Sequence, residues 1–170
     1  MTTAAELKAR QAPLKERYRA DPASALVTMH AEALLLPPAI SCRVVNPSSA
    51  DPGLHPAAAG DGTARCSGDM LLEALVACAG VTLLAVATAS GVAIRAGTVR
   101  AEGDLDFRGT LGVSRETPVG FQQVRVRFTL ETDATREQLD KLLVATERYC
   151  VVAQTIRVAV PVALDAETLP

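Results

Sequence analysis

The sequence has 170 residues, of which 49% are hydrophobic and only 3% are aromatic. This length and apolar content fit one globular domain with a core of Ala, Val and Leu, and they exclude a disordered chain. The net charge of -2 gives no electrostatic basis for binding nucleic acid or an anionic membrane. The first residues lack a basic segment leading into an apolar run, so we expect no secretory signal. Four cysteines are too few for a disulfide-stapled secreted scaffold, and we therefore expect a cytoplasmic protein.

The N-terminal residues predict a helical extension ahead of a single domain. Residues 4–19 are charged and helical in composition. Residues 1–23 are therefore interpreted as a helical extension, and residues 24–170 as one domain.

A strand pair and a loop are predicted next. Apolar and polar residues alternate over residues 24–35, which is typical of a strand. Residues 40–45 are expected to pair with it across the turn at residues 37–38, where two prolines follow each other. Residues 46–62 combine Pro and Gly with Ser, Asp and Ala, and this composition predicts a loop.

The longest apolar segment covers residues 70–89 and carries a single charge, Glu73. Such a segment is long enough to cross a bilayer. It lacks flanking Lys, Arg, Trp and Tyr anchors, however, and it is rich in Ala and Thr. A helix that is apolar on all sides is equally what the centre of a globular protein needs. The sequence therefore favours a buried central helix, with Gly91 at its end.

The C-terminal half predicts two strands, a helix and a final strand. Residues 93–107 and 121–131 are the strand candidates, and the second alternates cleanly between apolar and polar side chains. Asp133 is expected to cap a helix that runs towards Arg148. Residues 158–164 are expected to form a last short strand. This succession of strands and helices predicts an α+β fold.

Thiol chemistry is the class of reactivity that remains after the other kinds of site are excluded. The cysteines show no C-x-x-C spacing, and the two histidines are not paired at a helical interval, so a metal site is not expected. Nucleotide-binding glycine spacing and a G-x-S-x-G elbow are also absent from the sequence. Cys78 and Cys150 remain as candidates. Taken alone, a cysteine in an apolar helix is more often a core residue than a nucleophile.

Three segments give these cysteines a context. Residues 67–78 place a short acidic turn before an Ala/Leu-rich helix that reaches Ala-Cys at Cys78. Residues 118–124 carry Gly-Phe at the entry to a strand, and residues 147–152 read Glu-Arg-Tyr-Cys-Val-Val. In this order they resemble the OsmC/Ohr family, the osmotically inducible protein C and organic hydroperoxide resistance proteins. The resemblance covers residues 67–164.

The resemblance implies a thiol-dependent reductase of organic hydroperoxides that acts in oxidative-stress defence. Cys78 would be the peroxidatic residue, whose thiolate attacks the distal peroxide oxygen and becomes a sulfenic acid. Cys150 would resolve that acid to a disulfide, which keeps the oxidation reversible. An external thiol reductant, which is of lipoyl type in several family members, would then restore both thiols. The resemblance implies neither a metal nor a nucleotide cofactor.

An acid and an arginine near the attacking sulfur are also implied by the resemblance. A free thiol is mostly protonated at neutral pH, so its thiolate must be stabilised. Asp69 stands where the family usually has Glu, nine residues before Cys78, and Glu73 is an off-register competitor. Arg43 is the preferred candidate for the activating arginine, with Arg65 as the alternative.

The family fold would consist of antiparallel sheets around a long buried central helix, with two chains intertwined in a homodimer. The active sites would lie at the interface of the two chains, without nucleic acid or membrane as partners. One further departure from the family is Val151, because the second cysteine is usually followed by Pro.

Two other interpretations remain open. An OsmC-like protein without a well-placed arginine would bind a small apolar ligand or sense redox state, with little peroxidase turnover. A purely structural stress protein would keep its cysteines as core residues. Cys42 and Cys66 are interpreted as bystanders, although Cys66 is near enough in sequence to compete as a resolving thiol.

Overall fold

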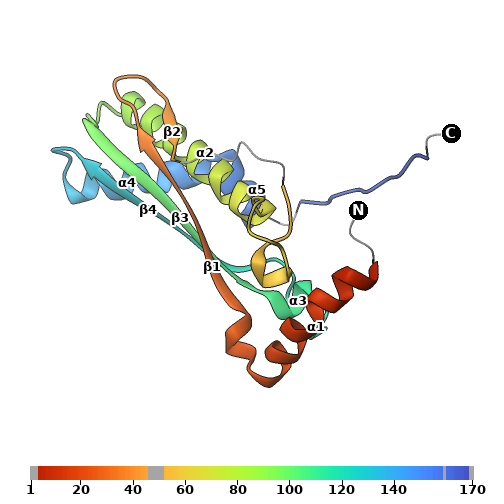
Figure 1. The fold of residues 1–170 in the computed structure, drawn as a ribbon. Helices are drawn as coiled ribbons and strands as arrows, with labels where there is room; N and C mark the ends of the chain where they lie inside the picture. The colour runs from red at the N-terminus through yellow and green to blue at the C-terminus, as the bar shows by residue number, and fades with distance from the viewer. Residues whose placement is uncertain (1–3, 46–51, 159, 169–170) are drawn as a thin grey trace.

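The computed structural model describes residues 4–45, 52–158 and 160–168. Within them lies a four-stranded antiparallel sheet with the strand order β2-β1-β3-β4. The strands are β1 (Leu26–Leu35), β2 (Cys42–Val44), β3 (Ala96–Asp106) and β4 (Phe121–Glu131). Helix α2 (Ser67–Ala89) packs against one face of this sheet (Figure 1). The helices α4 (Arg136–Tyr149) and α5 (Val151–Arg157) pack against α2. The predicted α+β class is confirmed.

The strand predictions are confirmed because each strand separates an apolar face from a polar one. On β1, the buried side chains Met29, Ala33 and Leu35 alternate with exposed ones and share the face that α2 covers. β2 pairs antiparallel with β1, as expected for the strand over residues 40–45. The opposite face of the sheet carries ion pairs, including Arg125 with Asp104, and faces solvent.

Helix α2 is the central helix that the sequence predicts. Its length and composition would allow it to cross a membrane, but it packs against β1, β3 and α4 instead. Gly91, with a positive φ of 68°, follows the end of the helix, where glycine has no Cβ to clash. The side chains buried along α2 form the main core and come from Leu72, Leu75, Val76, Ala79, Leu83, Leu84 and Ala87.

The N-terminal helix α1 (Ala4–Ala20) is attached to the body of the molecule by Tyr18. This side chain is fully buried, and its hydroxyl donates a hydrogen bond of 2.9 Å to the carbonyl oxygen of Ala57. The short helices η1 (Pro22–Ala25), η2 (Pro56–Ala58) and α3 (Phe107–Thr110) lie at the same end of the sheet. Residues 46–51 of the predicted loop lie outside the described residues.

The predicted cap of α4 at Asp133 is wrong. Thr135 is the N-cap: its hydroxyl accepts from the backbone N–H of Gln138, whose side chain accepts in return from the N–H of Thr135. This reciprocal capping box satisfies two N–H groups that the first turn leaves unpaired. Asp133 lies two residues after the end of β4 and instead accepts a 3.1 Å hydrogen bond from Arg95.

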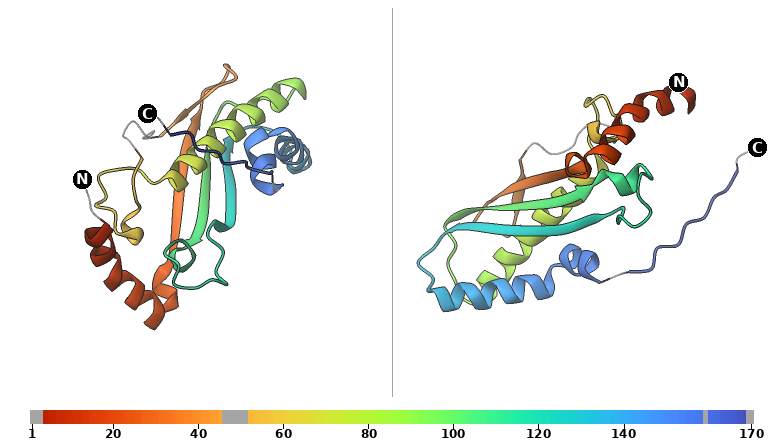
Figure 2. Two further views of the ribbon diagram at one scale, coloured as in Figure 1. Left: turned by 90° about the vertical axis from the view of Figure 1, so that its right-hand side faces the viewer. Right: turned by 90° about the horizontal axis from the view of Figure 1, so that it is seen from below.

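The predicted strand over residues 158–164 is also wrong. Helix α5 comes directly after α4, and the described residues that follow it have no strand pairing. They form an extended tail that runs away from the body of the protein (Figure 2). A strand needs a neighbour for its N–H and C=O groups, and the described part of this single chain offers none there. Val162 and Leu164 are therefore 81% and 94% exposed.

Candidate active site

Cys78 lies near the middle of α2 and is half-buried. Cys150 is buried at the joint between α4 and α5. Its backbone is extended, with φ -73° and ψ 107°, and this interrupts the helix for one residue. The joint is held by hydrogen bonds of 2.9 Å from the N–H of Cys150 to Thr146 and from the N–H of Gln154 to the carbonyl of Cys150. The sulfur of Cys150 is thereby fixed at a sharp change of chain direction.

The fold brings the two predicted cysteines together. The α4–α5 segment packs against α2 and brings Cys150 close enough to Cys78 for each side chain to shift the pKa of the other. Both are free thiols. Two cysteines that are far apart in sequence thus form an adjacent dithiol.

The surroundings of Cys78 favour its thiolate. Burial raises the pKa of Cys78, but hydrogen bonds from the Val152 N–H, the Cys150 thiol, the Thr82 hydroxyl and the Val151 N–H outweigh it and lower the pKa overall. Burial raises the pKa of Cys150, and the neighbouring Cys78 raises it further. Cys78 is therefore the better nucleophile of the pair, and Cys150 remains a protonated thiol.

Val151 contributes to this environment through its backbone. It is the first residue of α5, a position at which proline is well tolerated because its N–H has no helical partner. Proline would carry no N–H there, whereas Val151 keeps one and donates it to Cys78. The departure from the usual Pro therefore adds a donor beside the sulfur.

The structure does not bring Arg43 to Cys78 within one chain. On β2 the neighbouring Cys42 faces α2, so Arg43 points to the opposite face of the sheet. Its cross-strand partner Leu34, which is 40% exposed, lies on that same outer face. The other candidate, Arg65, forms an ion pair of 2.7 Å with Glu73.

Asp69 also lies away from Cys78. Nine residues along an α-helix correspond to a rise of about 13 Å and a rotation of about half a turn. Asp69 is instead close enough to His55 for its charge to act on that ring. Burial lowers the pKa of His55, and Asp69 opposes that shift. The half-buried carboxylate therefore belongs to the first turn of α2 and its contact with the loop before it.

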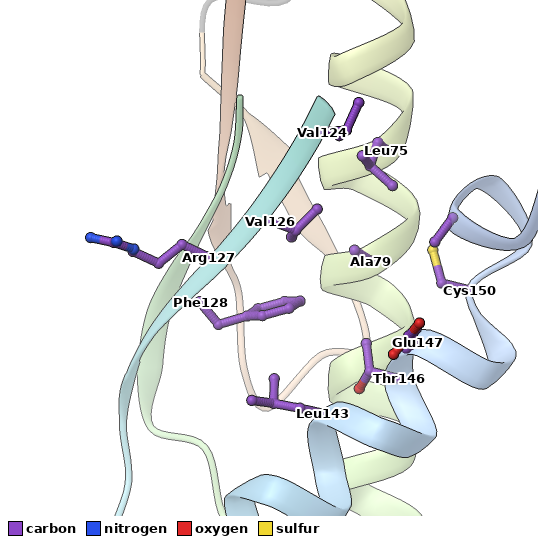
Figure 3. Close-up of a pocket in the computed structure, with 11 residues that line it drawn as sticks. Leu75, Ala79, Val124, Val126, Arg127, Phe128, Leu143, Thr146, Glu147 and Cys150 are labelled. Carbon is purple, nitrogen blue, oxygen red and sulfur yellow. The ribbon is translucent and has the colours of Figure 1, made fainter. Parts of the chain in front are cut away.

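An apolar groove of about 540 Å³ opens beside Cys150 between β4, α2 and α4. Val124, Val126 and Phe128 of β4 point into it, while Arg127 points away (Figure 3). The alternation of β4 predicts its apolar face, but the sequence does not reveal that this face stays partly uncovered. The groove can accommodate an apolar group next to Cys150.

Metal binding has no support in the described part of the chain. Within residues 4–45, 52–158 and 160–168, no three His, Cys, Asp or Glu side chains are grouped so that they could hold a metal ion.

Comparison with known proteins identifies the family. The family model for OsmC-like proteins matches residues 60–165, which is more than half of the chain. The chain belongs to the OsmC family. A crystal structure of an OsmC-like hydroperoxide resistance protein from Jannaschia sp. CCS1 is similar to this OsmC-family protein, with a TM-score of 0.61. The match covers 85% of this chain and 95% of that one at 15% sequence identity. A search of curated proteins finds no match.

Proposed function

We propose that this OsmC-family protein reduces organic hydroperoxides with Cys78 as the peroxidatic and Cys150 as the resolving cysteine. The adjacency of the two thiols, with the pKa lowered at Cys78 and raised at Cys150, carries this proposal. Family membership and the fold shared with a hydroperoxide resistance protein support it.

The reaction balances with two thiols and one external reductant. The Cys78 thiolate attacks the distal peroxide oxygen, so that the O–O bond breaks, an alkoxide leaves and Cys78 becomes a sulfenic acid. The Cys150 thiol then displaces the hydroxyl group, which forms a disulfide and releases water. An external dithiol, such as a lipoyl group, returns both cysteines to the reduced state by thiol–disulfide exchange. Neither a metal nor a nucleotide takes part in this cycle.

Substrate binding is assigned to the apolar groove. The alkyl part of an organic hydroperoxide would lie against Val126 and Phe128, beside the dithiol. Burial of this apolar surface would favour organic hydroperoxides over hydrogen peroxide. We place the activity in the cytoplasm, where reducing conditions keep both thiols available.

We further propose that the protein is a homodimer built on the exposed face of α2. Leu71, Ala74, Val81 and Ala85 are exposed on this face and follow one another at intervals of three, seven and four residues. Cys78 divides the interval of seven into four and three, which completes the pattern. This 3-4 spacing is the one by which two helices pack along a seam. A second copy would cover the stripe and bring its own side chains to Cys78. If the protein sedimented as a monomer at micromolar concentration, the homodimer proposal would be refuted.

The peroxidase proposal is tested by consumption of cumene hydroperoxide with a dithiol reductant. Cys78→Ser is expected to lose activity, and Cys66→Ser is the matched control that retains it, because Cys66 lies at the start of α2. Cys150→Ser, treated with peroxide while dimedone is present from the start, is expected to carry the dimedone adduct on Cys78. Equal low consumption by the wild-type protein, Cys78→Ser and Cys150→Ser would refute the proposal.

A second candidate function is binding of a small apolar ligand with redox sensing. It is favoured by one observation, namely that the groups acting most strongly on Cys78 are neutral donors and include no arginine. In that case the protein would form the Cys78–Cys150 disulfide only once, with slow reduction, while an apolar fluorescent probe would bind in the groove. Multiple turnovers with a dithiol would exclude this function.

A further inference from the structure

Cys42 is a third thiol beside Cys78. Its sulfur donates a hydrogen bond of 3.4 Å to the carbonyl oxygen of Ala77, which belongs to the peptide group that joins Ala77 to Cys78. Standard bond lengths then place the sulfurs of Cys42 and Cys78 within about 9 Å of each other before any side chain rotates. Cys42 is half-buried and points from β2 towards α2.

The close packing of Cys42 against α2 depends on a glycine in that helix. A Cβ atom at Gly80 would lie 3.3 Å from the sulfur of Cys42. It would lie 3.1 Å from the side chain of Leu35, which is the cross-strand partner of Cys42. The missing side chain at Gly80 therefore allows the edge strand to approach the helix closely. Because β2 has only three residues and, among the described strands, pairs only with β1, a small shift of this strand costs few hydrogen bonds.

Cys42 and Cys150 reach α2 from different sides. Cys42 comes from β2 at one edge of the sheet, whereas Cys150 comes from the α4–α5 joint, next to β4 at the other edge. Cys42 contacts α2 at Ala77 and Gly80, whereas Leu75 and Ala79 of α2 line the groove together with Cys150. Because successive residues of an α-helix are turned by about 100°, Cys78 points between these two sides. Contact with one thiol therefore does not require displacement of the other. Two separate thiols are thus available to one attacking sulfur.

The charge on Cys78 also contributes to the pKa of Cys42. Burial raises the pKa of Cys42, the Val81 N–H lowers it, and the negative charge at Cys78 raises it again. Cys42 is therefore a protonated, poorly reactive thiol while Cys78 is a thiolate. Oxidation converts Cys78 into a neutral sulfenic acid, and this repulsion then disappears. Cys42 becomes easier to ionise when a thiol is needed to capture the sulfenic acid.

We propose that Cys42 is a second resolving thiol for Cys78, which acts when Cys150 is absent or already consumed. The Cys42 thiol attacks the sulfenic sulfur of Cys78, the S–O bond breaks, and a Cys42–Cys78 disulfide and water are formed. The external thiol reductant of the main cycle then reduces this disulfide. The inference rests on the proposed peroxidase function, because that function supplies the sulfenic acid, and it adds protection of Cys78 against irreversible oxidation.

The test uses Cys150→Ser in the full chain, oxidised with one equivalent of cumene hydroperoxide. Intact mass and peptide mapping are expected to show an intrachain Cys42–Cys78 disulfide, with the loss of two thiol hydrogens and Cys66 free for alkylation. Dimedone added after the peroxide should find no sulfenic acid. The matched double variant Cys66→Ser/Cys150→Ser should behave identically, since Cys66 lies about 18 Å along the helix axis from Cys78.

The variant Cys42→Ser/Cys150→Ser is the decisive comparison. Its Cys78 sulfenic acid should persist at least about tenfold longer than in Cys150→Ser, because intramolecular capture is lost. Equal lifetimes in the two proteins, or a disulfide that links two chains, would overturn the role of Cys42 and leave the peroxidase proposal intact. Absence of Cys78 oxidation in every variant would instead refute the peroxidase function. Treatment of Cys150→Ser with diamide, which joins thiols without peroxide, must also give the Cys42–Cys78 bond if the geometry is correct.

Discussion

At the level of single residues, the reactivity of Cys78 depends on hydrogen-bond donors that converge on its sulfur. Two of these donors are backbone N–H groups at the start of α5, from Val151 and Val152. A backbone donor can be removed without changing any charge in the protein. Val151 offers this opportunity because its position in the helix tolerates proline.

We predict that Val151→Pro raises the pKa of Cys78. Proline removes the N–H while α5 keeps its first turn, and the extended backbone of Cys150 is compatible with a following proline. The thiolate is the reactive form, so alkylation of Cys78 by iodoacetamide should slow at neutral pH. Its pH profile should shift to higher pH, with equal rates once both proteins are fully ionised.

Val151→Ala is the control for this prediction. It removes the same side chain but keeps the N–H, so its alkylation profile should coincide with that of the unsubstituted protein. The measurement uses a protein that also carries Cys42→Ser and Cys66→Ser, so that Cys78 and Cys150 are its only thiols open to alkylation. Coincident profiles for Val151→Pro and Val151→Ala would show that this backbone donor has no effect on Cys78.

Short motifs around each cysteine predict both Cys78 and Cys150, and the structure places them together. The supporting residues could not be predicted in the same way. Whether Arg43 reaches Cys78 depends on which face of β2 it occupies, and this follows from the pairing of β2 with β1 rather than from its neighbours in sequence. Asp69 illustrates the same point, because a match in sequence order does not place a side chain on the matching face of a helix.

At the level of elements, the start of α4 is determined by reciprocal capping. We predict that Thr135→Ala lowers the free energy of unfolding by about 1 kcal/mol, since an N–H in the first turn loses its acceptor. Urea denaturation followed by circular dichroism measures this change. Asp133→Ala is expected to cost clearly less, because its ion pair with Arg95 is solvent-exposed. If Asp133→Ala lowered the free energy of unfolding more than Thr135→Ala, the assignment of Thr135 as the N-cap would be contradicted.

Elements with a strong internal pattern were predictable from sequence. β4 has a strict alternation and α2 a long apolar run, so each signal lies within the element itself. Helix α5 has no such signal: its start at Val151 depends on the extended backbone of Cys150, which carries neither Gly nor Pro to mark a break. The extended tail alternates like a strand, yet strand formation depends on a neighbouring strand, and the described part of the chain supplies none beside the tail.

At the level of the whole molecule, the exposed stripe of α2 indicates how two copies would associate. We predict that Val81→Arg, in the centre of the stripe, weakens dimerisation by about 3 kcal/mol or more, since it would bury an unpaired charge between two helices. Val81 is 38% exposed in the single chain, so the substitution leaves the core of the monomer unchanged. Sedimentation velocity over a range of concentrations measures the dissociation constant.

Val119→Arg is the matched control for the dimer prediction. Val119 is 63% exposed in the loop before β4 and does not belong to the α2 stripe, so the same change of side chain should leave the dimer intact. Circular dichroism should show the same helix content for both variants. Dissociation by both substitutions, or by neither, would contradict the assignment of the interface to the α2 stripe.

The extended tail also affects the solubility of the protein. Val158, Val160, Val162 and Leu164 expose alternate apolar side chains, a pattern that readily adds to the edge of a sheet in another molecule. Pro161 lies among them and has no N–H to donate, so a strand formed here can pair along one edge only. This proline therefore acts as a gatekeeper: the tail can join one neighbouring strand, but it cannot serve as a template for open-ended aggregation.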